Sequence, residues 1–105
     1  MLFKKDLIDL ILAGKKTMTS RSKKLCDAGD LTNIMANKDY SKQTGKYLRI
    51  TKVYRKFLGE FTVEDSHREG FSGLGKFKSY WEKNIGVWDP TQLLWVHEFG
   101  ILLKE

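Results

Sequence analysis

The chain contains few of the residues that cross-link or interrupt a fold, since its 105 residues include a single cysteine, Cys26, and a single proline, Pro90. A lone cysteine cannot form an intramolecular disulfide, so we expect a reducing, cytoplasmic setting. The longest nearly apolar stretch, residues 7–13, contains Asp9 and is far shorter than the roughly 20 residues that span a bilayer. We therefore expect one domain over residues 1–105, with no membrane segment and no signal peptide.

Charge is divided unevenly along the chain, whose formal net charge is +6. Residues 1–57 contain 14 Lys+Arg and 5 Asp+Glu, a net charge of +9, whereas residues 58–105 contain 5 Lys+Arg and 8 Asp+Glu, a net charge of −3. A basic half of this kind attracts polyanions such as nucleic acids. The ordinary alternative is that the lysines serve only to keep a small protein in solution.

The pattern of apolar residues predicts the element order helix, strands, two helices, strand. The segments are a helix over residues 3–13, strands over 15–21, 31–36 and 47–61, helices over 62–70 and 72–85, and a strand over 92–103. Loops are predicted over residues 22–30 and 37–45. The strand over 47–61 has no purely apolar face, so we expect a bulge in it. These short, mixed elements favour an α+β fold with a small curled sheet or barrel.

The first helix and the turn after it carry the most informative motif. Residues 14–21 read Gly-Lys-Lys-Thr-Met-Thr-Ser-Arg. Together with the helix, they resemble the signature of the ASCH domain family: Gly-x-Lys-Thr, an apolar residue, Thr or Glu, and an Arg two residues later. The segments Gly29–Asp30, Asp65–Phe71 and Val96–Phe99 resemble further parts of the family pattern. The resemblance covers about residues 3–102 and implies a small β-barrel of the PUA-like superfamily.

The family is thought to act on RNA or on components of nucleic acids. One branch of similar length consists of amidohydrolases that remove the acetyl group from 4-acetylcytidine with a Lys, a Thr and a Glu. The resemblance places these roles on Lys16, Thr19 and Glu69. Many relatives have Glu in place of Thr19, so this residue favours the amidohydrolase branch. Ser20 departs from the pattern, because the family has an apolar residue at that position.

The chemistry of these residue types agrees with such a reaction. A threonine hydroxyl is a poor nucleophile unless a base takes its proton, and a lysine acts as that base only when its pKa falls towards neutrality. Lys16 and Thr19 are three residues apart, so they would face opposite sides of a straight strand. The assignment therefore requires Lys16 to lie in the turn after Gly14. Glu69 would protonate the departing amine or position water for the release of acetate.

Lys15 and Arg21 supply positive charge beside the motif, and we predict that they bind an anion or the developing oxyanion. The less specific interpretations are a solvated Lys16, a strand-forming Thr19, a surface Glu69, and an Arg21 paired with an acid such as Glu98. No spacing typical of metal ligands occurs, and no cofactor is implied.

The second hypothesis is an RNA-binding module, with or without ribonuclease activity. A basic loop with interleaved tyrosines and one tryptophan beside a turn supply the predicted RNA contacts. These are Lys38, Tyr40, Lys42, Lys46 and Trp88. Trp81 and Trp95 have helix and strand spacing that predicts a place in the core, whereas Trp88 is expected to be exposed. The predicted partner is thus a nucleoside or RNA.

Overall fold

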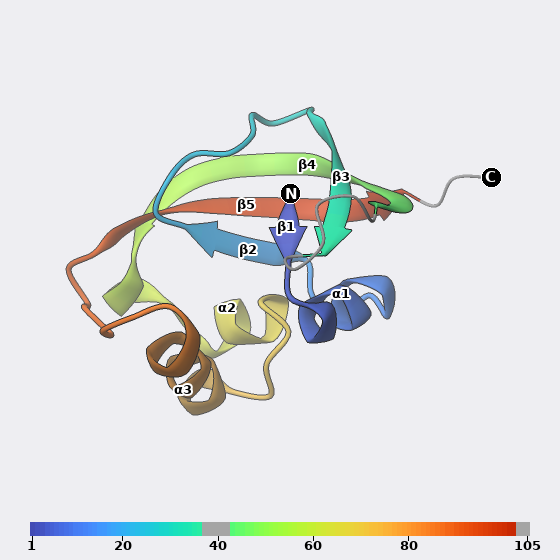
Figure 1. The fold of residues 1–105 in the computed structure, drawn as a ribbon. Coiled ribbons are helices and arrows are strands. Elements are labelled where there is room, and N and C mark those ends of the chain that lie inside the picture. The colour runs from blue at the N-terminus through green and yellow to red at the C-terminus, as the bar shows by residue number, and fades with distance from the viewer. Residues whose placement is uncertain (37–42, 103–105) are drawn as a thin grey trace.

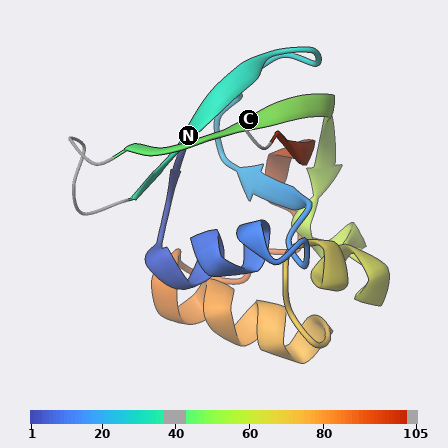
Figure 2. The same cartoon turned by 90° about the vertical axis from the view of Figure 1, so that its right-hand side faces the viewer.

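The computed structural model describes residues 1–36 and 43–102, which form one curled sheet with helices along one side of it (Figures 1 and 2). The strands are β1 (Leu2–Phe3), β2 (Met18–Arg21), β3 (Leu31–Ala36), β4 (Gln43–Phe57) and β5 (Leu93–Leu102). The helices are α1 (Lys5–Leu12), α2 (Val63–Arg68) and α3 (Leu74–Asn84), with a 3₁₀ turn, η1, at Leu58–Glu60. This α+β arrangement has the predicted element order, apart from the added first strand.

The strands lie in the order β1-β3-β4-β5-β2, and every neighbouring pair is antiparallel except β1 and β3. The long β4–β5 pair shifts register between Ile50 and Lys52, which is the bulge predicted for this strand. A bulge increases local twist and bends its strand. The sheet is therefore strongly curved and forms a half-barrel over the helices (Figure 1).

Several predicted boundaries were wrong, and the strand predicted over residues 15–21 begins only at Met18. The first helix begins at Lys5, because Phe3 instead pairs with Ala36 of β3 and is buried. The strand predicted to reach residue 61 ends at Phe57, where the chain enters the 3₁₀ turn. Residues 43–45, predicted as loop, belong to β4, while residues 37–42 lie outside the described part of the chain.

Two apolar clusters fill the interior. The first joins β1, α1, β3, β4 and β5 and contains Phe3, Ile8, Ile11, Ile34, Leu48, Ile50 and Phe99. The second joins β2, α3, β5 and the segment around η1 and contains Met18, Leu58, Phe61, Phe77, Trp81, Leu94 and Val96. In residues 1–36 and 43–102, no helix has both the length and the apolar character needed to cross a membrane.

Candidate active site

Lys16 lies in the turn between α1 and β2, as the chemistry of the motif requires. Gly14 has a positive φ of 76°, and the main-chain N–H groups of Lys15 and Lys16 both donate to the carbonyl of Leu10. β2 begins only at Met18, so strand alternation does not fix the direction of the Lys16 side chain. That side chain turns inward, and Lys16 is only 3% exposed.

Glu69 ends α2 and meets Lys16 inside the protein. The ammonium of Lys16 donates to the Oε1 atom of Glu69 at 3.0 Å and to its main-chain oxygen at 3.0 Å. Ser20 donates from its Oγ atom to Oε2 of Glu69 at 2.6 Å. Glu69 is 3% exposed, so both carboxylate oxygens are satisfied by protein donors rather than by bulk water.

The main chain holds α2 against the turn that carries Lys16. The N–H of Thr17 donates to the carbonyl of Arg68 at 2.7 Å, immediately before Glu69. Gly70 follows with a φ of 103°, and a Cβ atom there would lie 3.0 Å from Leu10 Cδ1 and 3.3 Å from Lys16 Cβ. A glycine is therefore needed to let the end of α2 approach this closely.

Thr19 and Arg21 share one face of β2, as strand alternation predicts. Thr19 is 5% exposed, and its Oγ1 atom accepts a hydrogen bond from Nε of Arg21 at 3.3 Å. The Arg21 guanidinium also lies over the ring of Phe3, 5.1 Å from its centroid. These contacts hold the positive charge of Arg21 next to the Thr19 hydroxyl.

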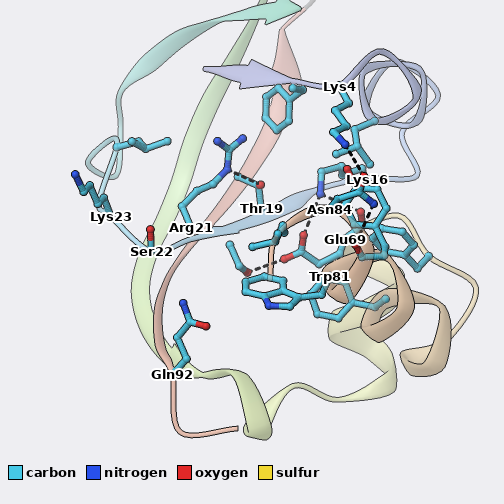
Figure 3. A pocket seen from close by; sticks show the side chains of 18 residues that line it. Lys4, Lys16, Thr19, Arg21, Ser22, Lys23, Glu69, Trp81, Asn84 and Gln92 are labelled. Atoms are coloured by element: carbon cyan, nitrogen blue, oxygen red, sulfur yellow. Dashed lines mark hydrogen bonds and ion pairs between the residues drawn. The ribbon is translucent and has the colours of Figure 1, made fainter. Parts of the chain in front are cut away.

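These polar groups line one cavity of about 580 Å³ (Figure 3). Its polar wall includes Lys16, Thr19, Ser20, Arg21 and Glu69, and its aromatic wall includes Phe3, Phe71, Phe77, Tyr80 and Trp81. The volume lies within the range of pockets that enclose small molecules. Both apolar clusters contribute to the lining, so the cavity lies where the two cores meet.

Burial changes the acid–base behaviour of the site. Loss of hydration lowers the pKa of Lys16, and the charge of Arg21 lowers it further, whereas the charge and hydrogen bond of Glu69 act in the opposite direction. The net effect is a lowered pKa, which makes the neutral amine more accessible than in an exposed lysine. A partly deprotonated lysine is able to accept a proton from a neighbouring hydroxyl.

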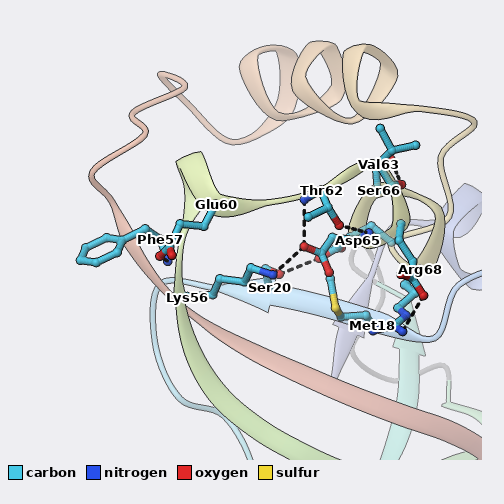
Figure 4. A network of polar contacts seen from close by, with 12 residues as sticks. Met18, Ser20, Lys56, Phe57, Glu60, Thr62, Val63, Asp65, Ser66 and Arg68 are labelled. Atoms are coloured by element: carbon cyan, nitrogen blue, oxygen red, sulfur yellow. Dashed lines mark hydrogen bonds and ion pairs between the residues drawn. The ribbon is translucent and has the colours of Figure 1, made fainter.

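Further polar contacts fix the N-terminal end of α2 (Figure 4). Thr62 caps the helix, since its hydroxyl accepts from the N–H of Asp65 while the carboxylate of Asp65 accepts from the N–H of Thr62. Lys56 of β4 donates to the same carboxylate at 2.7 Å. Strand β4 thereby anchors the helix that presents Glu69.

Sequence reasoning missed two parts of the site. Ser20 was noted only as a departure from the family pattern, and that departure was the available signal for its polar contact. The other part is the α1–α3 end of the cavity, where Lys4 donates to Oδ1 of Asn84 at 2.5 Å and lies 5.9 Å from the centroid of the Tyr80 ring. No sequence pattern connects these residues, because they are 80 positions apart.

Other predicted site residues are placed differently. Lys15 is exposed and does not line the cavity, so the structure does not bring it to Arg21. Glu98 pairs with Met18 in the β2–β5 ladder. Burial lowers the pKa of Arg21, and the charge of Glu69 opposes that shift. Within the described part of the chain, no group of three or more His, Cys, Asp or Glu side chains is placed to hold a metal ion.

The predicted RNA contacts form no single described surface. Lys38, Tyr40 and Lys42 lie outside the described residues, and Lys46 is half-buried. The expectation that Trp88 is exposed was wrong, because it is half-buried and packs edge-on against Phe77 and Trp81.

The remaining tryptophans differ from each other. Trp81 is buried in the core as predicted. Trp95 is only half-buried, contrary to the prediction. Its ring lies near two cations, 4.7 Å from Arg55 and 5.5 Å from Lys24, measured to the ring centroid.

Comparison with known proteins identifies the fold. No family model and no curated protein matches the sequence. Among solved structures, an ASCH domain from Lactobacillus crispatus JV V101 has a TM-score of 0.65 and 17% identity over 91% of this chain and 70% of that chain. The fold is that of ASCH domains.

Two further structures agree. Protein EF3133 from Enterococcus faecalis V583 has a TM-score of 0.66 and 20% identity over 92% of this chain and 67% of that chain. A mutant of ZmASCH from Zymomonas mobilis has a TM-score of 0.66 and 15% identity over 95% of this chain and 66% of that chain. The sheet of the present chain is thus an ASCH-type half-barrel, and its chemistry has to be argued from its own residues.

Proposed function

We propose that this ASCH-type chain is a small amidohydrolase that removes the acetyl group from the exocyclic amine of 4-acetylcytidine or a related acylated cytidine-type nucleoside. The observation that carries the proposal is that Lys16, Thr19 and Glu69 line one cavity, although Glu69 is 53 positions from Lys16. Buried ionisable groups whose pKa is shifted, gathered in a cavity, are typical of catalytic sites.

In the proposed first step, the Thr19 hydroxyl oxygen attacks the acetyl carbonyl carbon while the neutral amine of Lys16 takes the hydroxyl proton. Arg21, which already donates to Thr19, stabilises the negative charge that develops on the carbonyl oxygen. The C–N bond then breaks, and the ammonium of Lys16 returns a proton to the departing exocyclic nitrogen. The products of this step are cytidine and an acetyl ester on Thr19.

In the second step, water attacks the acetyl carbon, the ester C–O bond to Thr19 breaks, and the proton that the water gives up passes through Glu69 to the Thr19 oxygen, so that acetic acid and the free hydroxyl are released. Glu69 is suited to position this water and accept its proton. Two donors, Lys16 and Ser20, bind the two oxygens of its carboxylate, so the group acts as an acceptor in both contacts. Of the two roles considered for Glu69, the contacts therefore support the positioning of water.

The aromatic wall explains why a nucleobase would enter. The rings of Phe71 and Tyr80 are 5.1 Å apart between centroids, and both line the cavity. Such surfaces stack well on a flat pyrimidine and exclude water from the reacting amide.

The test incubates the protein with 4-acetylcytidine and measures the release of cytidine by liquid chromatography. Lys16→Met and Thr19→Val keep the approximate shape of each side chain, and each should lower kcat/KM by about a thousand-fold, the scale of lost acid–base or nucleophilic catalysis. Lys76→Met, an exposed substitution on α3, is the matched control and should retain activity. A wild-type protein that releases no cytidine would end the proposal for this substrate.

A separate observation favours RNA binding as the second candidate function. Trp95 of β5 is half-buried beneath Arg55 and Lys24, and such a combination of cations and an aromatic ring is suited to the phosphates and bases of single-stranded RNA. None of these three residues lines the cavity, so the two candidate functions predict different sensitive residues.

A further inference from the structure

Ser20 makes the shorter of the two side-chain contacts to the Glu69 carboxylate, and the reaction steps above assign it no role of its own. Its Oγ atom donates to Oε2 of Glu69 at 2.6 Å, and Ser20 is only 7% exposed. A buried hydroxyl and a buried carboxylate each need a partner, because an unpaired polar group away from water is costly. The contact therefore satisfies both groups at once.

We propose that Ser20 is a positioning residue, which fixes the Glu69 carboxylate in the orientation that accepts a proton from the hydrolytic water. This inference rests on the proposed amidohydrolase function. Lys16 binds Oε1 and the main-chain oxygen of Glu69, and these contacts alone leave Oε2 without a protein donor. The hydroxyl of Ser20, which comes from β2, supplies the second point of attachment and stops the carboxylate from rotating.

The position of Ser20 in the strand explains how it reaches Glu69. Thr19 and Ser20 are neighbours in β2, yet both line the cavity, because the end of α2 lies against the strand beside Ser20. The strand thus contributes consecutive hydroxyls with separate tasks. The oxygen of Thr19 accepts a hydrogen bond from Arg21, whereas Ser20 donates its own proton to a carboxylate.

The rival assignment makes Ser20 the attacking hydroxyl, because a hydroxyl that donates to a base is also the arrangement of an activated nucleophile. The contacts of Glu69 favour positioning instead. Lys16 already binds the other oxygen of this carboxylate, so the Ser20 contact completes a pair of contacts that hold the group in place. Thr19 lies beside Arg21 and is better placed for the development of charge during attack.

The kinetic test compares three variants. Ser20→Ala removes the donor, Ser20→Thr retains a hydroxyl, and Ser79→Ala is an exposed control on α3. We expect Ser20→Ala to lower kcat and KM together, each by about 30-fold, with kcat/KM changed less than about two-fold, because the first step is unaffected while the slowed second step lets the acetyl ester accumulate. Ser20→Thr should recover most of the rate, and Ser79→Ala should behave as wild type.

A readout that needs no turnover separates this inference from the proposed function. Carbon-13 labelling of the glutamate carboxyls, with Glu69→Gln used for assignment, should show that Ser20→Ala shifts the Glu69 signal while Ser79→Ala does not. An unmoved signal overturns the positioning role, even if the wild type hydrolyses acetylcytidine. If the signal moves but no protein releases cytidine, the amidohydrolase function fails and the contact stands. An acetyl group trapped on Ser20 rather than on Thr19 would also overturn the proposal.

Discussion

At the scale of single residues, the approach of Glu69 to Lys16 depends on Gly70, which has no Cβ atom. Its φ of 103° lies in the region that side chains rarely adopt, and an added Cβ would press on Leu10 and Lys16. The backbone conformation and the lack of space act together, so the requirement for glycine is stronger here than in an ordinary turn.

We predict that Gly70→Ala lowers the free energy of unfolding by about 1–3 kcal/mol and also reduces hydrolysis, since the added methyl group displaces Lys16. Urea unfolding and the cytidine-release assay would measure the two effects. Gly75→Ala is the control, because a Cβ at this exposed position in α3 meets nothing within 4 Å. That control should gain about 0.5–1 kcal/mol. A Gly70→Ala protein as stable as wild type would contradict the steric argument.

The sequence was sufficient to bring Lys16, Thr19 and Arg21 together, because they lie in one short motif with a turn and a strand of known periodicity. The sequence was not sufficient to predict the contact of Ser20 with Glu69. Alternation assigns Ser20 to the face opposite Thr19, and its partner arrives from α2, 49 positions away. The contact arises from tertiary packing, which local periodicity does not encode.

At the scale of elements, β5 holds one wall of the cavity through His97. This residue is 0% exposed, and its Nε2 atom accepts a hydrogen bond from the N–H of Leu25, which lies in a segment that lines the cavity. Burial lowers the pKa of His97, and the charges of Arg21 and Lys24 lower it further, against the opposing effect of the Thr19 and Trp95 backbone.

We predict that acid destabilises the protein through His97. The unfolded imidazole binds a proton near pH 6.5, whereas the folded one binds it only at lower pH, so the unfolded state holds more protons in that window. Stability therefore falls as the pH drops below 6.5, by at most about 1.4 kcal/mol per pH unit.

Urea unfolding at about pH 7.5 and about pH 5.5 would measure this loss. His97→Gln keeps an acceptor for the N–H of Leu25 but cannot titrate, so its stability should change less between the two conditions. His67→Gln, at an exposed position, should retain the wild-type dependence. An unchanged pH dependence in His97→Gln would assign the acid effect to other groups.

The element order and the strand over Leu31–Ala36 followed from sequence, whereas the ends of the longest strand did not. The alternating pattern continues past Phe57, but main-chain hydrogen bonds redirect the chain there: Leu58 donates to the carbonyl of Gln92, and Gly59 to that of Pro90. These partners are more than 30 positions away. The two-residue β1 was missed because so short a strand has no detectable period.

At the scale of the whole molecule, the excess of positive charge in residues 1–57 is larger than a neutral nucleoside requires. The described residues give part of it a location, with Arg55 and Lys24 beside Trp95. None of these three side chains lines the cavity, so substitutions can distinguish the two candidate functions.

If the protein binds single-stranded RNA, affinity should fall steeply with salt, with a logarithmic slope of about −0.7 for each phosphate contacted. Fluorescence anisotropy with a labelled oligonucleotide would measure it. The double variant Arg55→Gln and Lys24→Gln should make the slope less steep, by the amount expected for the loss of about two phosphate contacts. Lys16→Met should leave the slope unchanged. Affinity that does not respond to salt would count against an RNA partner.

The cavity lies where the two apolar cores meet, with Phe3 and Leu7 from one and Phe77 and Trp81 from the other in its lining. A bound ligand would contact residues of both clusters and so link the stability of one to that of the other. Amide hydrogen exchange should then slow in β1 and α1 as well as in α3 when a non-hydrolysable analogue is added. Slower exchange in elements of both apolar clusters would thereby show that the cavity is occupied.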